Sequence, residues 1–521
     1  MNDSSTTAST VSAGRFVRFT RWFFSWRTFK WILFCAIPCL VMLLLAIVWF
    51  EAWRGRRAWE EFRAEWEAKG ERFDWRALIP PPVPDEENFA KTPLLADLFN
   101  RKWDPQTKRV KLADGAAEKR AEEAFPKWAP RHSGNWRLGV ATDLDAVLKG
   151  YLEAEKITNA PAGPPAAAIL AALERYRPVL DEWAAASKRP HVRYDLHYEH
   201  GAGMLMPHLT LLRSASRAYH YRAAARLALG QTDAALADVR MQFYLAHTLG
   251  TEPLLISQLV RIALLETALQ DVWDGMTARR WSDEQLQELQ RQLARVDALA
   301  DYVLAMRGER DIFSNGFFDT LLAGDREQLR ILFNSGSPDD LSSVGLRFMP
   351  RGWIYQNKLT VNRMFMETTL PMVDLKARRV FPEKSAAEEA SLKSMRTTPY
   401  NVFCGLLFPA LARGTQRAAT LQTAVDHARI ACAIERHRLA KGGLPETLGD
   451  LTMLPAAFLE RLPRDVVTGG PIQYRREPGG RFILWSVGWD GKDDGGTVAT
   501  KSASTPDFER LDWAWPARPA K

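Results

Sequence analysis

The chain has 521 residues, 46% of them hydrophobic and 25% charged, and its formal net charge is +8. This length allows roughly two to four domains. Because basic residues alternate with acidic ones over most of the chain, we expect no nucleic-acid partner. Four cysteines are too few for a disulfide framework, and Cys404 and Cys432 either pair or remain buried thiols.

Residues 31–50 form an uncharged run that is long enough to cross the roughly 30 Å hydrocarbon layer as one helix. Tryptophans flank this run on both sides, which suits the membrane–water interface. A cleaved signal peptide would have a shorter apolar stretch followed by small residues, whereas residues 48–53 are mostly bulky. The sequence therefore predicts an uncleaved signal anchor.

A basic cluster before the anchor predicts the orientation of the chain. The cluster consists of Arg15, Arg18, Arg21, Arg27 and Lys30. Such residues remain on the cytoplasmic side and contact anionic lipid headgroups. We therefore expect a single-pass protein of the cell inner membrane, with residues 1–30 as a basic cytoplasmic tail and a periplasmic ectodomain.

Residues 51–87 are expected to form a juxtamembrane helix and a proline-rich linker. Aromatic residues recur at helical spacing up to Lys69, so the helix continues the anchor and ends near Gly70. The prolines between Ile79 and Pro84 then impose an extended chain and indicate a domain boundary.

Residues 88–416 favour an irregular helical ectodomain, because no strand-like alternation competes with the helical periodicity. Ser282 and Gln285 have the spacing of a capping box and predict the start of a helix. Residues 224–253 resemble a single tetratricopeptide-type repeat, in which small residues pack two helices together. Because such arrays need at least about three repeats, an ordinary helical hairpin is the alternative.

Residues 417–521 combine a long helix with a β-hairpin. The helix ends at Gly442, and two β-like runs, 472–477 and 481–487, are joined by Pro-Gly-Gly. Whether residues 510–515 add a strand stays open. The expected fold class is mainly α: one transmembrane helix, a helical ectodomain with a hairpin, and a small C-terminal α/β unit.

This C-terminal order of parts resembles the periplasmic part of the major pseudopilin of type II secretion systems. In that family a long helix leads through a G-x-x-P segment and an L-P-x-D turn to a hairpin and a loop rich in glycine and aspartate. The matching positions here are Gly442, Pro445, Leu451, Leu462, Pro463, Asp465, Gly470, Tyr474, Ser486, Gly488, Asp490, Gly491, Gly495 and Gly496. The resemblance covers only this end of the chain and implies a pseudopilin-like tail.

The chain departs from the pseudopilin pattern at its N-terminus. The glutamate expected early in the hydrophobic helix is missing, and the anchor is separate from the C-terminal helix, so we expect no pseudopilin-type polymerisation. The complete arrangement also resembles a family of membrane proteins from Planctomycetes and Verrucomicrobia. That family has no assigned activity, so the resemblance implies an architecture and no reaction.

The first candidate site is a metal site in the glycine- and aspartate-rich loop. Asp490, Asp493 and Asp494 place three carboxylates in one short flexible segment, and calcium prefers oxygen ligands. The pseudopilin loop binds calcium, so the resemblance also implies a calcium site here. Residues 497–501 lack the family's further acidic positions, and a solvated acidic turn is the alternative.

The second candidate is a cluster of histidines and carboxylates between residues 191 and 208. It consists of His191, Asp195, His197, Glu199, His200 and His208. One helical turn would place His197 and His200 on the same face, as a zinc site requires. Because the spacing is not H-E-x-x-H and glycines follow at once, we expect structural or surface histidines.

Three hypotheses for function follow from these observations. The first is a non-enzymatic envelope scaffold that contacts membrane lipid and binds other envelope proteins. The second is an accessory of a type II secretion or pilus-like system. The third is a membrane-tethered hydrolase with an unrecognised site, although the sequence has no phosphate-binding loop and no nucleophile elbow. We expect the first, and the oligomeric state stays open.

Overall fold

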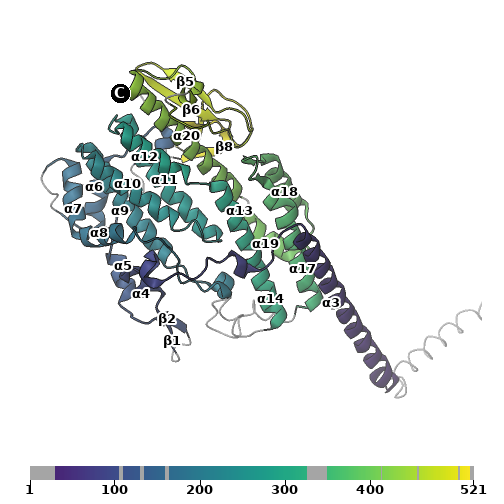
Figure 1. Cartoon of the computed structure of the whole chain (residues 1–521). Helices are drawn as coiled ribbons and strands as arrows, with labels where there is room; N and C mark the ends of the chain where they lie inside the picture. The colour runs from purple at the N-terminus through teal and green to yellow at the C-terminus, as the bar shows by residue number, and fades with distance from the viewer. Residues whose placement is uncertain are drawn as a thin grey trace, which may run out of the picture.

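The computed structural model describes residues 30–104, 109–128, 134–158, 163–324, 349–411, 413–453, 457–502 and 505–516. Over these residues the chain is mainly helical, with one long apolar helix near the N-terminus and small antiparallel sheets at the C-terminal end. Figure 1 shows the apolar helix projecting from one side of the ectodomain, whereas the C-terminal strands lie at the other end. The predicted fold class is confirmed.

The apolar run forms a π-helical turn, η1 (Ile32–Ala36), followed by helix α3 (Ile37–Ala68). Among the described residues, one helix is long and apolar enough to cross a membrane, and the mean hydropathy of its apolar 18-residue stretch is 2.8. Helix α3 continues without a break beyond the apolar run and ends before Gly70, whose φ is +94°. The predicted helical continuation of the anchor is therefore confirmed.

The proline-rich linker is extended and lies against the ectodomain. It joins two short 3₁₀ helices, η2 (Trp75–Leu78) and η3 (Asp85–Glu87). The Nε of Arg193 donates a hydrogen bond to the Pro80 carbonyl oxygen at 3.0 Å, and Ile79 packs on the main hydrophobic core. Proline fixes the extended backbone, and these contacts hold the segment in place.

The first part of the ectodomain surrounds three long helices, α9 (His208–Ala228), α10 (Thr232–His247) and α11 (Leu255–Thr277). Helices α9 and α10 pack as a hairpin across a turn at Gly230, whose φ is +75°, and the predicted hairpin is confirmed. The shorter elements are η4 (Phe89–Lys91), α4 (Pro93–Phe99), β1 (Arg101–Asp104), β2 (Arg109–Leu112), α5 (Ala117–Glu123), η5 (Trp136–Leu138), α6 (Leu144–Ala154), α7 (Pro165–Leu173), η6 (Glu174–Tyr176), α8 (Arg177–Ala186) and η7 (Tyr198–Gly203).

The second part of the ectodomain begins with α12 (Asp283–Ala294). Its Ser282 hydroxyl accepts from the Gln285 amide, and the Gln285 side chain accepts from the Ser282 amide, so the predicted capping box is confirmed. The elements that follow are α13 (Ala298–Gly308), π-helix η8 (Glu309–Asn315), α14 (Gly316–Ala323), α17 (Arg351–Arg363), π-helix η9 (Met364–Thr369), η10 (Leu370–Met372), β3 (Val373–Asp374), β4 (Arg379–Val380), α18 (Pro382–Ser394) and α19 (Val402–Leu411).

The C-terminal unit begins with helix α20 (Gly414–Lys441), which ends at Gly442 with a φ of +78° as predicted. After η11 (Leu448–Thr452), the predicted hairpin is formed by β5 (Gln473–Glu477) and β6 (Arg481–Ser486). Strand β9 (Trp513–Trp515) pairs antiparallel with β6, so the sheet order is β5-β6-β9. A second hairpin of β7 (Val498–Ser502) and β8 (Thr505–Leu511), which the sequence pattern did not indicate, connects β6 to β9.

The C-terminal unit shares its core with the ectodomain. The largest hydrophobic cluster extends from Phe89 to Trp515 and includes most of the apolar side chains of α20. Helix α20 is buried on nearly all sides and packs on α11, α12 and α13 as well as on β9. Cys404 and Cys432 are free, buried thiols.

Candidate functional site

The glycine- and aspartate-rich loop connects β6 to β7 and is exposed. The Oδ1 of Asp490 accepts a hydrogen bond from the Lys492 amide at 3.2 Å. The Oδ1 of Asp493 accepts from the Trp485 indole at 2.9 Å and from the Gly495 amide at 3.0 Å. These bonds form a compact loop in which the carboxylates of Asp490 and Asp493 accept bonds from the loop and its flanking strand.

A fourth carboxylate, which the sequence analysis did not single out, lies beneath the loop. Asp512 directly precedes β9 and is only 1% exposed. Its Oδ2 accepts hydrogen bonds from the Asp494 amide at 3.0 Å and from the Gly496 amide at 2.7 Å. Its Oδ1 is buried and has no hydrogen-bond partner among the described residues.

The environment of Asp512 disfavours its charge. The pKa of Asp512 is raised to about 6, mainly by burial; the two backbone donors lower it, and the nearby carboxylates of Asp493 and Asp494 also raise it. A bound cation would offset this excess of negative charge. Within the described residues, however, no group of three or more His, Cys, Asp or Glu side chains is placed to hold a metal ion. The calcium site therefore stays a prediction, with Asp512 as an added ligand.

Two polar contacts join the segments that resemble the pseudopilin. The Oδ1 of Asp465 accepts from the Val467 amide at 2.7 Å, and its Oδ2 accepts from the Val487 amide at 2.9 Å, so this carboxylate links the L-P-x-D turn to the end of β6. The Tyr474 hydroxyl donates to the Pro445 carbonyl oxygen at 2.9 Å and links β5 to the G-x-x-P segment. The matching positions thus form one structural unit.

The histidine cluster does not converge on one point. His191 lies 3.4 Å from Glu87, His197 lies 3.0 Å from Glu199, and His200 stacks on His197 with ring centroids 5.2 Å apart. His208 is fully buried elsewhere, and its Nε2 lies 2.9 Å from the Oε1 of Glu252. Asp195 is exposed and, among the described residues, forms no hydrogen bond or ion pair with this set.

Two buried polar networks were not foreseen from the sequence. In the first, Glu252 accepts a short hydrogen bond from the Ser257 hydroxyl and also contacts His208. In a hydrolase triad the histidine contacts the serine hydroxyl directly. Here the Glu252 carboxylate lies between the Ser257 hydroxyl and the His208 imidazole, so this arrangement differs from a triad. In the second, Asp271 contacts His220 at 2.9 Å and accepts from Gln242 at 2.7 Å. Both networks bind interior helices together.

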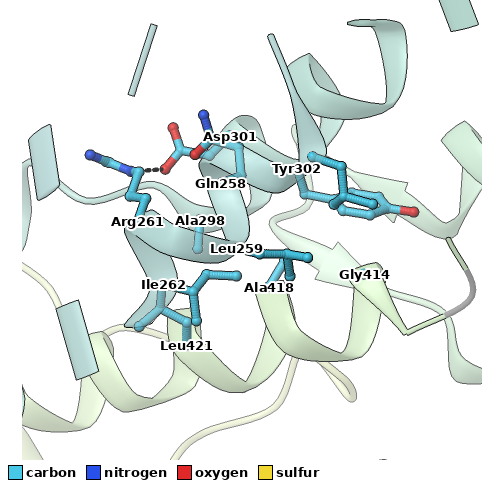
Figure 2. A pocket seen from close by; sticks show the side chains of 11 residues that line it. Gln258, Leu259, Arg261, Ile262, Ala298, Asp301, Tyr302, Gly414, Ala418 and Leu421 are labelled. Atoms are coloured by element: carbon cyan, nitrogen blue, oxygen red, sulfur yellow. Dashed lines mark hydrogen bonds and ion pairs between the residues drawn. The ribbon is translucent and has the colours of Figure 1, made fainter. Parts of the chain in front are cut away.

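A small hollow with room for about one water molecule lies between α11, α13 and α20 (Figure 2). Most of its lining is apolar, from Leu255, Leu259, Ile262, Ala298, Ala418 and Leu421. The Nε of Arg261 donates to Asp301 at 2.8 Å on one side, as Figure 2 shows. The Gln258 amide nitrogen donates to two backbone carbonyls. The charged side chains of this hollow pair with each other, and the hollow is far smaller than a ligand pocket, so it supports no binding site.

Comparison with known proteins adds no assignment: no family model, no curated protein and no solved structure matches the chain. Its function is therefore argued from its geometry.

Proposed function

We propose that this chain is a single-pass envelope protein that acts as a non-enzymatic scaffold, presenting its helical ectodomain and C-terminal unit to other envelope proteins. In this proposal the N-terminus is cytoplasmic and the ectodomain is periplasmic. The observation that carries it is the packing of the anchor helix directly on the ectodomain. Such an arrangement sets the height and orientation of the binding surfaces.

The anchor helix packs along α17 through two glycines. A Cβ on Gly352 would lie 2.6 Å from the Glu51 carbonyl carbon, and one on Gly55 would lie 3.0 Å from the Gly352 carbonyl oxygen. Further along, Trp59 and Phe62 of α3 are buried with Leu359 of α17. Small residues let the two backbones approach closely, so the helices form an extended interface.

The end of the anchor helix is held by buried charges. Glu71 accepts hydrogen bonds from Arg307 and Arg310, and Arg310 also donates to the Arg72 carbonyl oxygen. Arg310 is fully buried, and its guanidinium lies 4.3 Å from the centre of the Phe73 ring. Burial opposes the charge on Glu71, but the two arginines outweigh it and lower the pKa of this carboxyl. The anchor and the ectodomain are therefore joined at both ends of their interface.

A second candidate function is favoured by the C-terminal unit alone. The contacts among the segments matched to the pseudopilin support a single folded unit, which in this alternative docks on pilus-like proteins. Strand β5 lies at the edge of the β5-β6-β9 sheet and offers main-chain groups for pairing. Docking there would make the chain an accessory of a type II secretion or pilus-like system.

Crosslinking in intact membranes tests the scaffold proposal. A photo-crosslinking residue replaces Arg476, which is exposed on the edge strand β5, and the matched control replaces Lys393, which is exposed on α18. We expect position 476 to capture defined envelope proteins and position 393 to capture far fewer. Pilus or secretion components at position 476 would favour the accessory function. The absence of any neighbour at position 476 beyond the control would contradict both proposals.

A further inference from the structure

A second segment of the chain, the start of α17, lies beside the end of the apolar run. Gly352, at the start of α17, lies directly beside Glu51, the first charged residue after the run. Helices α3 and α17 run in the same direction from this point, because Leu359 packs with Trp59 and Phe62. The start of α17 is therefore level with the boundary of the membrane-spanning segment.

Helix α14 runs back toward the same boundary. Lys358 donates to Asp319 at 2.6 Å, and Arg351 donates to the Leu322 carbonyl oxygen at 3.0 Å. Later residues of α14 thus contact earlier residues of α17, so the two helices are antiparallel. The last residue of α14, Ala323, is exposed. Figure 1 shows α17 beside α3, with α14 on the other side of α17.

The side chains at this end of the molecule suit a lipid surface. Arg54, Arg56, Arg57 and Arg351 are all exposed, and the first three also form ion pairs with glutamates of α3. At 1.5 Å per residue, Arg54 lies about 6 Å beyond the apolar run, whereas Arg56 and Arg57 lie about 9–10 Å beyond it. Trp53 is 48% exposed among them. The headgroup layer extends roughly 5–7 Å beyond the hydrocarbon on each side, and tryptophan and basic residues are enriched there.

We propose that the exposed ends of α14 and α17, together with Arg351 and Trp53, contact the headgroups of anionic lipids. The occupant is lipid because this surface continues directly from the membrane-spanning run and carries basic side chains at headgroup depth. With the anchor, it gives the ectodomain two separate contacts with the bilayer, which fix its tilt. The inference depends on the anchor spanning the membrane and not on the scaffold activity.

Spin labelling of the full-length chain in lipid nanodiscs tests this contact. Cys35→Ser and Cys39→Ser remove the exposed native thiols, whereas Cys404 and Cys432 are buried. One label is then attached through Ala323→Cys at the end of α14. The matched control is Ala377→Cys, which is exposed in the β3–β4 turn beside the C-terminal unit.

In nanodiscs that contain phosphatidylglycerol, we expect the label at position 323 to lose most of its accessibility to a soluble nickel chelate, while the label at position 377 keeps it. Arg351→Glu with Arg57→Glu should restore accessibility at position 323.

Equal accessibility at both positions would overturn the proposal. Equal shielding in detergent would show that protein covers the site, and equal shielding in phosphatidylcholine alone would exclude anionic lipid as the determinant. Failure to enter nanodiscs would overturn the anchor itself, and with it this contact.

Discussion

At the scale of single residues, Asp512 and Arg310 are two buried charged groups that differ in how they are paired. Asp512 is buried with one oxygen unpartnered beneath the acidic loop. Arg310 is buried with full pairing to Glu71 and Asp311. An unpaired buried charge destabilises the fold, whereas a paired one becomes costly only when its partner is removed. We therefore expect stability to increase when a partner is supplied to Asp512 and to decrease when Arg310 is removed from its partners.

Calcium should stabilise the chain through Asp512. We expect the thermal midpoint of the detergent-solubilised protein to rise by a few degrees with calcium, because a cation would pair with the free Oδ1. Asp512→Asn should abolish that rise, whereas the control Asp507→Asn, a carboxylate of β8 outside the loop, should retain it. The same midpoint with calcium and with chelator in the unsubstituted protein would rule out the site.

Without calcium, Asp512 should make stability fall as pH rises. Its pKa is about 6 in the folded chain against 3.8 for an unperturbed aspartate. Because the folded state holds the proton more tightly, the stabilising contribution is complete below pH 3.8 and is lost as pH rises through about 6. Urea unfolding across this window should show the decline for the unsubstituted chain and a smaller decline for Asp512→Asn. Identical pH profiles would contradict the prediction.

Arg310→Met should destabilise the junction between α3 and the helical region by about 3–5 kcal/mol, because Asp311 would remain buried without its charged partner, while Glu71 would retain only Arg307. Arg307→Met is the matched control: its side chain is 40% exposed, so we expect a loss of roughly 1 kcal/mol or less. Denaturant unfolding of the full chain measures both. Equal losses would mean that the burial of Arg310 is not what stabilises the junction.

At the scale of elements, the interface between α3 and α17 is limited by its glycines. Gly352 faces the Glu51 backbone, which cannot move aside as a flexible side chain would. Gly405, in the middle of α19, has no atom within 4 Å of the position that a Cβ would occupy. The two glycines are both helical and differ mainly in their surroundings, so they form a controlled pair.

Gly352→Ala should cost roughly 1–3 kcal/mol, because the added methyl group forces the two helix backbones apart. Gly405→Ala should instead be neutral or stabilise by about 0.5–1 kcal/mol, because alanine favours the helix. Gly352→Ala should also speed proteolysis between Lys69 and Pro84 if the anchor helix loosens. A neutral effect of Gly352→Ala would show that the helices do not pack this closely.

At the scale of the whole molecule, the C-terminal unit depends on the ectodomain. Helix α20 packs on α11, α12 and α13, and Trp515 and Leu484 of the sheet belong to the main core. We therefore expect a fragment of residues 417–521 to expose this apolar face and to lack a cooperative thermal transition. Calorimetry of the fragment beside the full chain would measure this. A sharp transition in the isolated fragment would instead support an independent domain.

The sequence by itself determined those features whose causes are local. The uncharged run 31–50 specifies an apolar helix, Ser282 with Gln285 specifies a helix start, and Gly442 specifies the end of α20. In each case neighbouring residues supply the hydrophobicity, the capping bond or the positive φ that is required. The loop with Asp490, Asp493 and Asp494 was visible for the same reason.

Only the tertiary structure decided the contacts between distant residues. Asp512 lies at the loop because β9 pairs with β6. Glu71 and Arg310 form an ion pair although 239 residues separate them in the sequence. The second hairpin, β7 with β8, forms over residues that show no clear strand periodicity. Packing and long-range pairing, which no local pattern encodes, place these groups together. For that reason the sequence revealed the long apolar helix, whereas the structure revealed how this helix is joined to the rest of the chain.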